Sequence, residues 1–191
     1  NSLKKDNLIV NAGIGETTSE GGKRPMLYNF NKDRGYVIGS QLQINKIVTI
    51  LANYNADIKS KTEVEIGKNR DVKSTIEKIF KSFDYVINDF GISRKDLQGI
   101  GIGMHGIVDH KRGLLVFAPH FPQWHKNIQF SKIVEERYGV KVYIDNEART
   151  LACAEKIFGS GLKYRNIVSI DIEEGVGAGI IIRNDIYRGD N

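Results

Sequence analysis

Three consecutive β-rich segments, followed by helical and strand segments in alternation, leave few folds open to this chain. The three segments occupy residues 36–41, 46–54 and 58–66. Short polar turns join them, and the run 53–57 marks a hairpin. Apolar residues then recur at steps of three and four from Val72 to Phe90, which predicts a long helix that Gly91 ends. We therefore expect an antiparallel meander of three strands that continues into alternating helices and strands, a layered α/β fold.

The second half of the chain continues this alternation. A short apolar strand runs into a glycine turn at Gly106, and we expect Ser131 to cap the next helix. A later helix is predicted at 147–158. The other segments with the pattern of strands are 100–104, 114–118, 140–144, 167–172 and 177–182.

The composition is that of a globular chain. Of its 191 residues, 40% are hydrophobic and 3 are proline, so it can bury a core as one compact domain or as one lobe of a larger one. The 28 Lys and Arg against 23 Asp and Glu give a net charge of +5, a mild preference for polyanions that decides nothing alone. No apolar run reaches the ~18 residues of a membrane span. The single Cys153 excludes an internal disulfide and fits a reducing, cytoplasmic setting.

Both ends of the sequence suggest a longer protein. Residues 2–9 have the pattern of the last turns of an amphipathic helix without an upstream cap, so we expect a segment before them. Near the other end, a hairpin with a turn at Asn184-Asp185 returns a strand only as far as Gly189, so we expect more chain to follow.

A glycine-rich loop near the end of the chain carries an unexpected pair of charges. In the segment 171–179, the glycine spacing would let backbone amides approach a polyphosphate. Glu173 and Glu174 stand at the entrance of this loop. Two carboxylates repel phosphate, so the loop has the form of a phosphate cradle without its chemistry.

The four histidines raise the possibility of a metal site. They are His105, His110, His120 and His125, all in one stretch of the sequence. Their spacings match no ligand pattern on one helix or hairpin, and no cysteine accompanies them. We therefore predict no metal site in this chain.

Several motifs, in order, match one family. They are 101–109, 118–124, 143–148, Glu155 with Phe158-Gly159, 175–179 and 187–189. In this order they resemble the ROK family of bacterial sugar kinases and sugar-responsive transcriptional repressors, over nearly the whole chain. The resemblance implies an actin-like ATPase (ribonuclease H-like) fold with a sugar cleft between two lobes. Residues 35–191 would form the N-terminal lobe and the first hairpin of the second lobe.

The resemblance also implies a set of sugar-binding residues. These are His105, Gly106, His120, Asn146 and Glu147. In the kinases an Asp after an Asn acts as general base, and Glu147 stands at that position with its carboxylate one methylene further out. A misplacement of about 1 Å can cost on the order of 100-fold in rate. We therefore expect Glu147 to bind sugar hydroxyls, and we assign no catalytic residue.

Simpler interpretations exist for several of these positions. Asp145 or Asn146 could merely cap a helix whose dipole Glu147 favours. Trp124 could stack on a sugar, or simply pack its loop. His110 and His125 are expected to be solvated turn residues.

The first phosphate loop of the family's kinases is also altered. Where they carry Asp-x-Gly-Gly-Thr-Lys, residues 41–46 read Gln-Leu-Gln-Ile-Asn-Lys, so only Lys46 is kept. Gln41 lacks the charge expected near Mg²⁺. Gln43 and Ile44 put side chains where glycines would let the backbone meet phosphate. With the loop at 171–179 altered as well, we expect phosphoryl transfer to be lost.

The first part of the chain favours a repressor. Residues 1–34 resemble the end of a winged helix-turn-helix, with its last helix, wing and linker. The run 21–25 is flexible and basic enough for Lys23 and Arg24 to contact DNA in a minor groove. The alternative is a solvated loop with two charges.

These expectations combine into one hypothesis. The chain would be the effector-binding part of a ROK-type repressor that senses a pentose or hexose, binds operator DNA as a homodimer and is not an enzyme. It would hold no cofactor, and the family's zinc site would lie beyond Asn191. One alternative is an ATP-dependent sugar kinase with Glu147 as its base. Another is a dimerising scaffold that has lost sugar binding.

Overall fold

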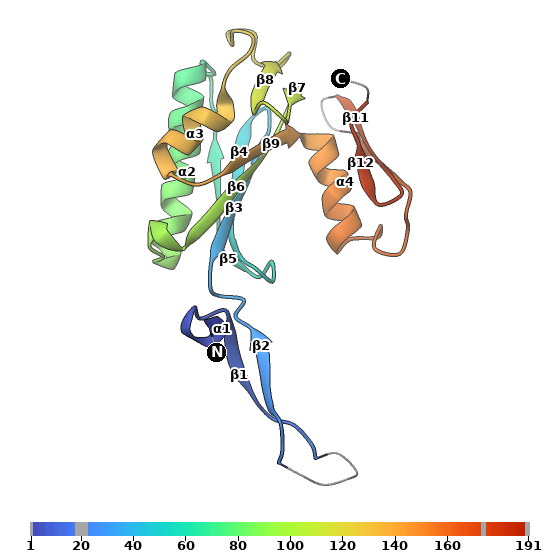
Figure 1. Cartoon of the computed structure of the whole chain (residues 1–191). Coiled ribbons are helices and arrows are strands. Elements are labelled where there is room, and N and C mark those ends of the chain that lie inside the picture. The colour runs from blue at the N-terminus through green and yellow to red at the C-terminus, as the bar shows by residue number, and fades with distance from the viewer. Residues whose placement is uncertain (1, 18–22, 173–174, 190–191) are drawn as a thin grey trace.

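The computed structural model describes residues 2–17, 23–172 and 175–189. Within these residues the chain forms an N-terminal arm, a five-stranded sheet with helices on one face, and a smaller C-terminal sheet that packs on a further helix. Figure 1 shows the arm extending away from the two sheets, and one helix standing between them. These three parts therefore follow one another in space in the same order as along the chain.

The arm is a short helix followed by a hairpin. α1 (Ser2–Lys5) precedes β1 (Ile9–Ile14) and β2 (Met26–Phe30), which pair antiparallel. The helix expected over 2–9 is thus too long, because the chain turns at Asn7, whose φ of 55° suits an asparagine, and Ile9-Val10 then start a strand. Hydrogen bonds join the arm to the connection that follows, and Arg34 Nε donates to the Asp6 carbonyl at 2.9 Å.

The five-stranded sheet contains the expected meander. Its strands are β3 (Tyr36–Leu42), β4 (Lys46–Asn53), β5 (Ile58–Glu65), β6 (Leu97–Met104) and β9 (Val142–Asn146), in the order β5-β4-β3-β6-β9. The first three pair antiparallel, whereas β6 joins β3 and β9 joins β6 in parallel. Antiparallel neighbours need only tight turns, whereas parallel ones need crossovers, which the intervening helices provide.

Helices α2 (Val72–Phe90) and α3 (Phe130–Tyr138) cover one face of this sheet and close the core (Figure 1). Asp71 caps α2 by accepting from the Ser74 amide at 2.9 Å, and Gly91 ends it in the left-handed conformation, as expected. Ile79 and Phe83 face the sheet, fully buried. The helix is amphipathic, and no helix among the described residues is long and apolar enough to cross a membrane.

The expected cap of α3 is wrong. Ser131 lies inside the helix, which begins at Phe130 after Gln129, and Gln129 makes no capping side-chain hydrogen bond. Phe130 is fully buried, so its packing brings the helix start forward. The Ser131 amide instead donates to the Gly113 carbonyl at 3.1 Å.

A hairpin and the C-terminal sheet complete the fold. β7 (Ile107–Asp109) and β8 (Leu114–Phe117) form the hairpin, and η1 (Arg94–Asp96) is a short 3-10 turn before β6. α4 (Glu147–Phe158), with the predicted bounds, packs mainly on β10 (Ile167–Ile172) and β11 (Val176–Ile182). β12 (Asp185–Tyr187) pairs with β11.

The last hairpin turns one residue earlier than expected. Ile182 pairs with Asp185, so the loop residues are Arg183 and Asn184 rather than Asn184 and Asp185. Both loop residues have positive φ, 53° and 74°. Positive φ at both positions is the conformation of a type I′ turn, which matches the twist of the two strands.

Candidate functional site

The parallel strands β6 and β9 end side by side, and their register sets which residues meet. Met104 of β6 faces Asn146 of β9. His105 and Glu147, which follow these two positions, therefore leave the sheet at the same edge. This is the carboxyl edge, where open α/β sheets commonly bind ligands.

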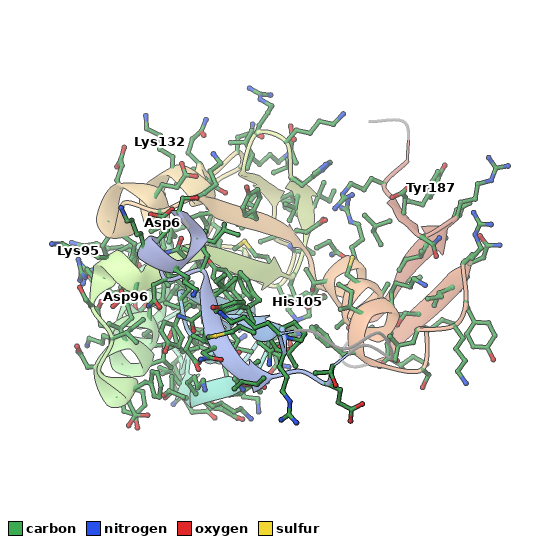
Figure 2. All side chains as sticks on the ribbon, turned by 60° about the horizontal axis from the view of Figure 1, so that its bottom comes forward. Asp6, Lys95, Asp96, His105, Lys132 and Tyr187 are labelled. Carbon is green, nitrogen blue, oxygen red and sulfur yellow. The ribbon has the colours of Figure 1, made fainter. Side chains whose placement is uncertain are left out.

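His105 and Glu147 form a buried pair. The Nδ1 atom of His105 contacts the Oε1 atom of Glu147, and the two side chains are only 10% and 13% exposed. The other ring nitrogen of His105, Nε2, is buried and has no hydrogen-bond partner among the described residues. Figure 2 shows His105 between the bulk of the five-stranded sheet and α4. The pair thus lies where the two parts of the protein meet.

Asn146 ties the start of α4 to the loop after β6. Its Oδ1 atom accepts from the Ala148 amide at 3.1 Å, and its Nδ2 atom donates to the Gly106 carbonyl at 3.1 Å. Asn146 therefore caps α4, as the simpler interpretation proposed, and it also lies at the carboxyl edge of the sheet. Gly106 has a φ of 114°, a conformation that side chains disfavour.

A cavity of about 150 Å³ lies at this edge. All five residues predicted to bind sugar line it, namely His105, Gly106, His120, Asn146 and Glu147. Asp171 and Gly177 of the C-terminal sheet line it as well. Sequence reasoning did not assign Asp171 to the site, although this residue begins the glycine-rich loop. The cavity therefore has walls from both sheets.

The remaining histidines lie in different surroundings. His120 is exposed, with its ring centroid 5.6 Å from that of His105, and His125 is exposed as expected. His110 is half-buried, not solvated as expected, since its turn folds back toward Arg188. Burial lowers the pKa of His110, and the nearby Arg188 guanidinium lowers it further. Among the described residues, no group of three or more His, Cys, Asp or Glu could hold a metal ion.

Trp124 packs its loop rather than facing the cavity. It is 7% exposed, and its ring lies 4.5 Å from that of Phe121, centroid to centroid. Its Nε1 atom donates to the Arg70 carbonyl at 2.6 Å. The indole N–H is thus hydrogen-bonded and the indole ring packs against Phe121. Trp124 therefore packs its own loop, as the simpler interpretation expected.

The polar groups of the turn at 41–46 bond to other groups of the protein. The Gln43 amide donates to the Lys46 carbonyl at 2.9 Å, and Lys46 Nζ lies 2.7 Å from Glu63 Oε2. The two lysines beside Glu63, Lys46 foremost, lower the pKa of its carboxyl to about 2.

Gln41 borders a second, larger cavity of about 440 Å³ between the sheet and α4. The other altered phosphate residues, Glu173 and Glu174, lie outside the described residues.

Asp145 is bound by two arginines, which the sequence did not suggest. Its carboxylate accepts from Arg188 Nη2 at 2.8 Å, and Arg149 Nε lies 3.2 Å away. Asp145 therefore does not cap α4 and instead links the end of β12 to β9.

The Cys153 thiol borders the larger cavity, and burial raises its pKa, as expected for a packed thiol.

The candidate DNA-contacting residues lie on the arm. Lys23 and Arg24 are exposed and come just before β2. The arm projects away from both sheets (Figure 1). Gly21 and Gly22 of the same basic run lie outside the described residues.

The order and direction of the strands in the five-stranded sheet define a class of protein, lobes with the actin-like ATPase fold. A solved structure of a ROK family transcriptional regulator, a homologue of the E. coli MLC protein, superposes with a TM-score of 0.78 at 22% identity and covers 98% of this chain and 46% of that chain. The expected fold is thereby confirmed. The sequence model of the ROK family matches residues 38–191, and the chain belongs to this family.

Curated relatives include both branches of the family. The xylose repressor of Caldicellulosiruptor bescii is 33% identical over 187 residues, which are 98% of this chain and 46% of that protein. The glucokinase of Thermotoga maritima is 30% identical over 128 residues, 67% of this chain and 37% of that protein. The chain thus spans about half the length of the repressor it matches.

Proposed function

We propose that this chain is the effector-binding part of a ROK-type transcriptional repressor, and that its effector is a neutral monosaccharide, a pentose such as xylose in the first instance. The observation that carries the choice against a kinase is the closed turn at 41–46. Its Gln43 amide donates to the Lys46 carbonyl and its Lys46 ammonium pairs with Glu63, so both groups already have partners within the protein. The similarity to a xylose repressor, which extends through the arm, supports the same choice.

Sugar binding would act on the joint between the two sheets. The cavity has one wall from the loops after β6 and β8 and another from α4 and the C-terminal sheet. A ligand that contacts both walls favours the closed arrangement of the two parts. In a dimer this changes the spacing of the two DNA-binding modules, and operator DNA is released.

The arm would belong to the DNA-binding module. We assign residues 1–34 to the end of a winged helix-turn-helix, with the β1–β2 hairpin as its wing and Lys23 and Arg24 as contacts to phosphates or base edges. Arg34, bonded to the Asp6 carbonyl, holds the arm against the connection to the sheet.

Thermal unfolding with a panel of monosaccharides, with and without Mg-ATP, tests this function. A sugar present at 100 times its Kd adds about 2.7 kcal/mol to the free energy of unfolding. For a chain of this size that raises Tm by about 5–11 °C. We expect one pentose to give this shift and Mg-ATP to add nothing. No shift with any sugar would reject the proposal in favour of a scaffold.

Two cap variants separate sugar binding from stability. Asn146→Ala and Asp71→Ala each remove a helix cap, which costs about 1 kcal/mol, but only Asn146 lines the cavity. In the full-length protein, we expect both variants to bind operator DNA without sugar, and only Asn146→Ala to keep the DNA when sugar is added. Equal sugar responses would place the effector elsewhere.

A sugar kinase with Glu147 as general base is the second candidate. Its support is the position of Asn146 and Glu147 at the cavity and the similarity to a glucokinase. Sugar-dependent consumption of Mg-ATP, lost in Glu147→Gln, would establish it. We expect no such turnover.

A further inference from the structure

We infer that His105 is the hydrogen-bond acceptor for one sugar hydroxyl, through Nε2, and that Glu147 is a positioning residue that fixes His105 in the tautomer this requires. The inference rests on the proposed function, because it assigns roles within the same cavity. It gives Glu147 a task other than taking a proton from the ligand.

The first step is the position of the ring proton. An ionised carboxylate only accepts hydrogen bonds, so the contact between Glu147 Oε1 and His105 Nδ1 needs the proton on Nδ1. A neutral imidazole has one N–H, so its Nε2 then carries a free lone pair. The Glu147 carboxylate in this way selects one tautomer of His105.

The second step is the surroundings of Nε2. His105 is 9% exposed, and Nε2 is buried without a hydrogen-bond partner among the described residues. A buried polar atom without a partner costs free energy, which a ligand that supplies the partner recovers. His105 lines the cavity of about 150 Å³, so a ligand there can reach it.

The third step is the charge of the ligand. Two carboxylates, those of Glu147 and Asp171, line the cavity, and His105 and His120 are its other titratable residues in the described part of the chain. Carboxylates repel phosphate esters and accept from hydroxyl groups. With Asn146 and the Gly106 backbone beside them, they suit a neutral polyhydroxylated molecule, not a sugar phosphate.

This arrangement also accounts for Glu147 at the position of a base. The lone pair of Glu147 Oε1 that accepts from His105 Nδ1 is not available to take a proton from a ligand hydroxyl, while the other lone pairs of the carboxylate can still accept hydrogen bonds. One ligand hydroxyl meets His105 Nε2, which accepts a hydrogen bond and leaves the proton on the sugar. Binding then proceeds without proton transfer.

NMR of the histidine ring nitrogens tests the tautomer. In long-range proton–nitrogen correlation spectra near pH 7.5, we expect His105 to be protonated at Nδ1 and bare at Nε2, and the Nε2 resonance to move on addition of xylose. Glu147→Ala should shift the proton to Nε2, the tautomer that free histidine prefers. A wild-type ring protonated at Nε2, or at both nitrogens, would overturn the inference.

Calorimetric titration with xylose tests the acceptor. His105→Asn keeps an N–H donor near the position of Nδ1 and lacks Nε2, so we expect affinity to fall about 10-fold, the loss for one hydrogen bond. His125→Asn, at an exposed histidine on the loop after β8 that does not line the cavity, is the matched control and should bind like wild type. Wild-type affinity in His105→Asn would refute the acceptor role. A wild-type protein that binds no monosaccharide would instead reject the proposed function itself.

Discussion

Replacing Gly106 by alanine tests how the site is built. The residue has a φ of 114°, and a Cβ atom there would lie 2.2 Å from the Phe117 carbonyl oxygen and 3.1 Å from the Ala118 Cα. Both obstacles are backbone atoms, so no side-chain rotation can relieve the clash. The loop after β6 must move, and with it the carbonyl that accepts from Asn146.

The cost has two parts. A strained φ costs about 2 kcal/mol, and forcing an extra methyl into a packed site costs about 2 kcal/mol more. About 4 kcal/mol corresponds to a fall in Tm of about 8–16 °C for a chain of this size. Because the displaced loop forms one wall of the cavity, we expect the sugar-induced shift in Tm to disappear as well.

Gly101→Ala is the matched control. Gly101 lies on the same strand, β6, and a Cβ atom there would meet no described atom within 4 Å, at an ordinary φ. Its Tm should stay within about 3 °C of wild type, because only the backbone entropy of the unfolded chain changes. If thermal unfolding shows the two variants to be equally stable, the argument from the Gly106 backbone is wrong.

Three further predictions concern the core and the surface charges. Trp124→Phe leaves the partly buried Arg70 carbonyl without its donor and should cost about 1 kcal/mol in urea unfolding while sugar affinity is kept. Phe83→Ala should cost about 3–5 kcal/mol in the same assay, because it empties a fully buried site. Lys32, through its hydrogen bond, lowers the pKa of Asp57 to about 2, so this pair stabilises the fold above pH ~4 and the contribution is lost between pH ~4 and ~2. The urea midpoint of Lys32→Met should therefore fall less than that of wild type over this range.

The elements with a strong period could be predicted from the sequence. The meander and α2 rest on long regular patterns and on the end signal at Gly91, and all of them are found. The helix over 2–9 and the last hairpin differ from the prediction at local turns, and two further predictions fail at single residues whose conformation depends on distant neighbours. Ser131 has the side chain of a cap, yet the burial of Phe130 moves the start of α3. His110 lies on a polar turn, yet that turn folds back toward Arg188.

The candidate site also has features that could be predicted from the sequence and features that could not. A family resemblance pointed to the residues around the cavity, and the parallel register of β6 and β9 explains why His105 and Asn146 leave the sheet together. The contact between His105 and Glu147 depends on that register and on the start of α4, so no local pattern could reveal it. Arg188, from the chain after β12, is far from Asp145 in the sequence and was missed for the same reason, whereas Arg149 lies only four residues after Asp145.

The position of α4 has a mechanical consequence. Its 12 residues start at Glu147, beside the cavity, and pack along β10 and β11. At 1.5 Å per residue the helix is ~18 Å long, so a rotation of ~10° about its first residue displaces its far end by ~3 Å. The C-terminal sheet packs on α4 and would move with it. Under the proposed function, a ligand that rotates α4 about its first turn would therefore shift the C-terminal sheet relative to the five-stranded sheet.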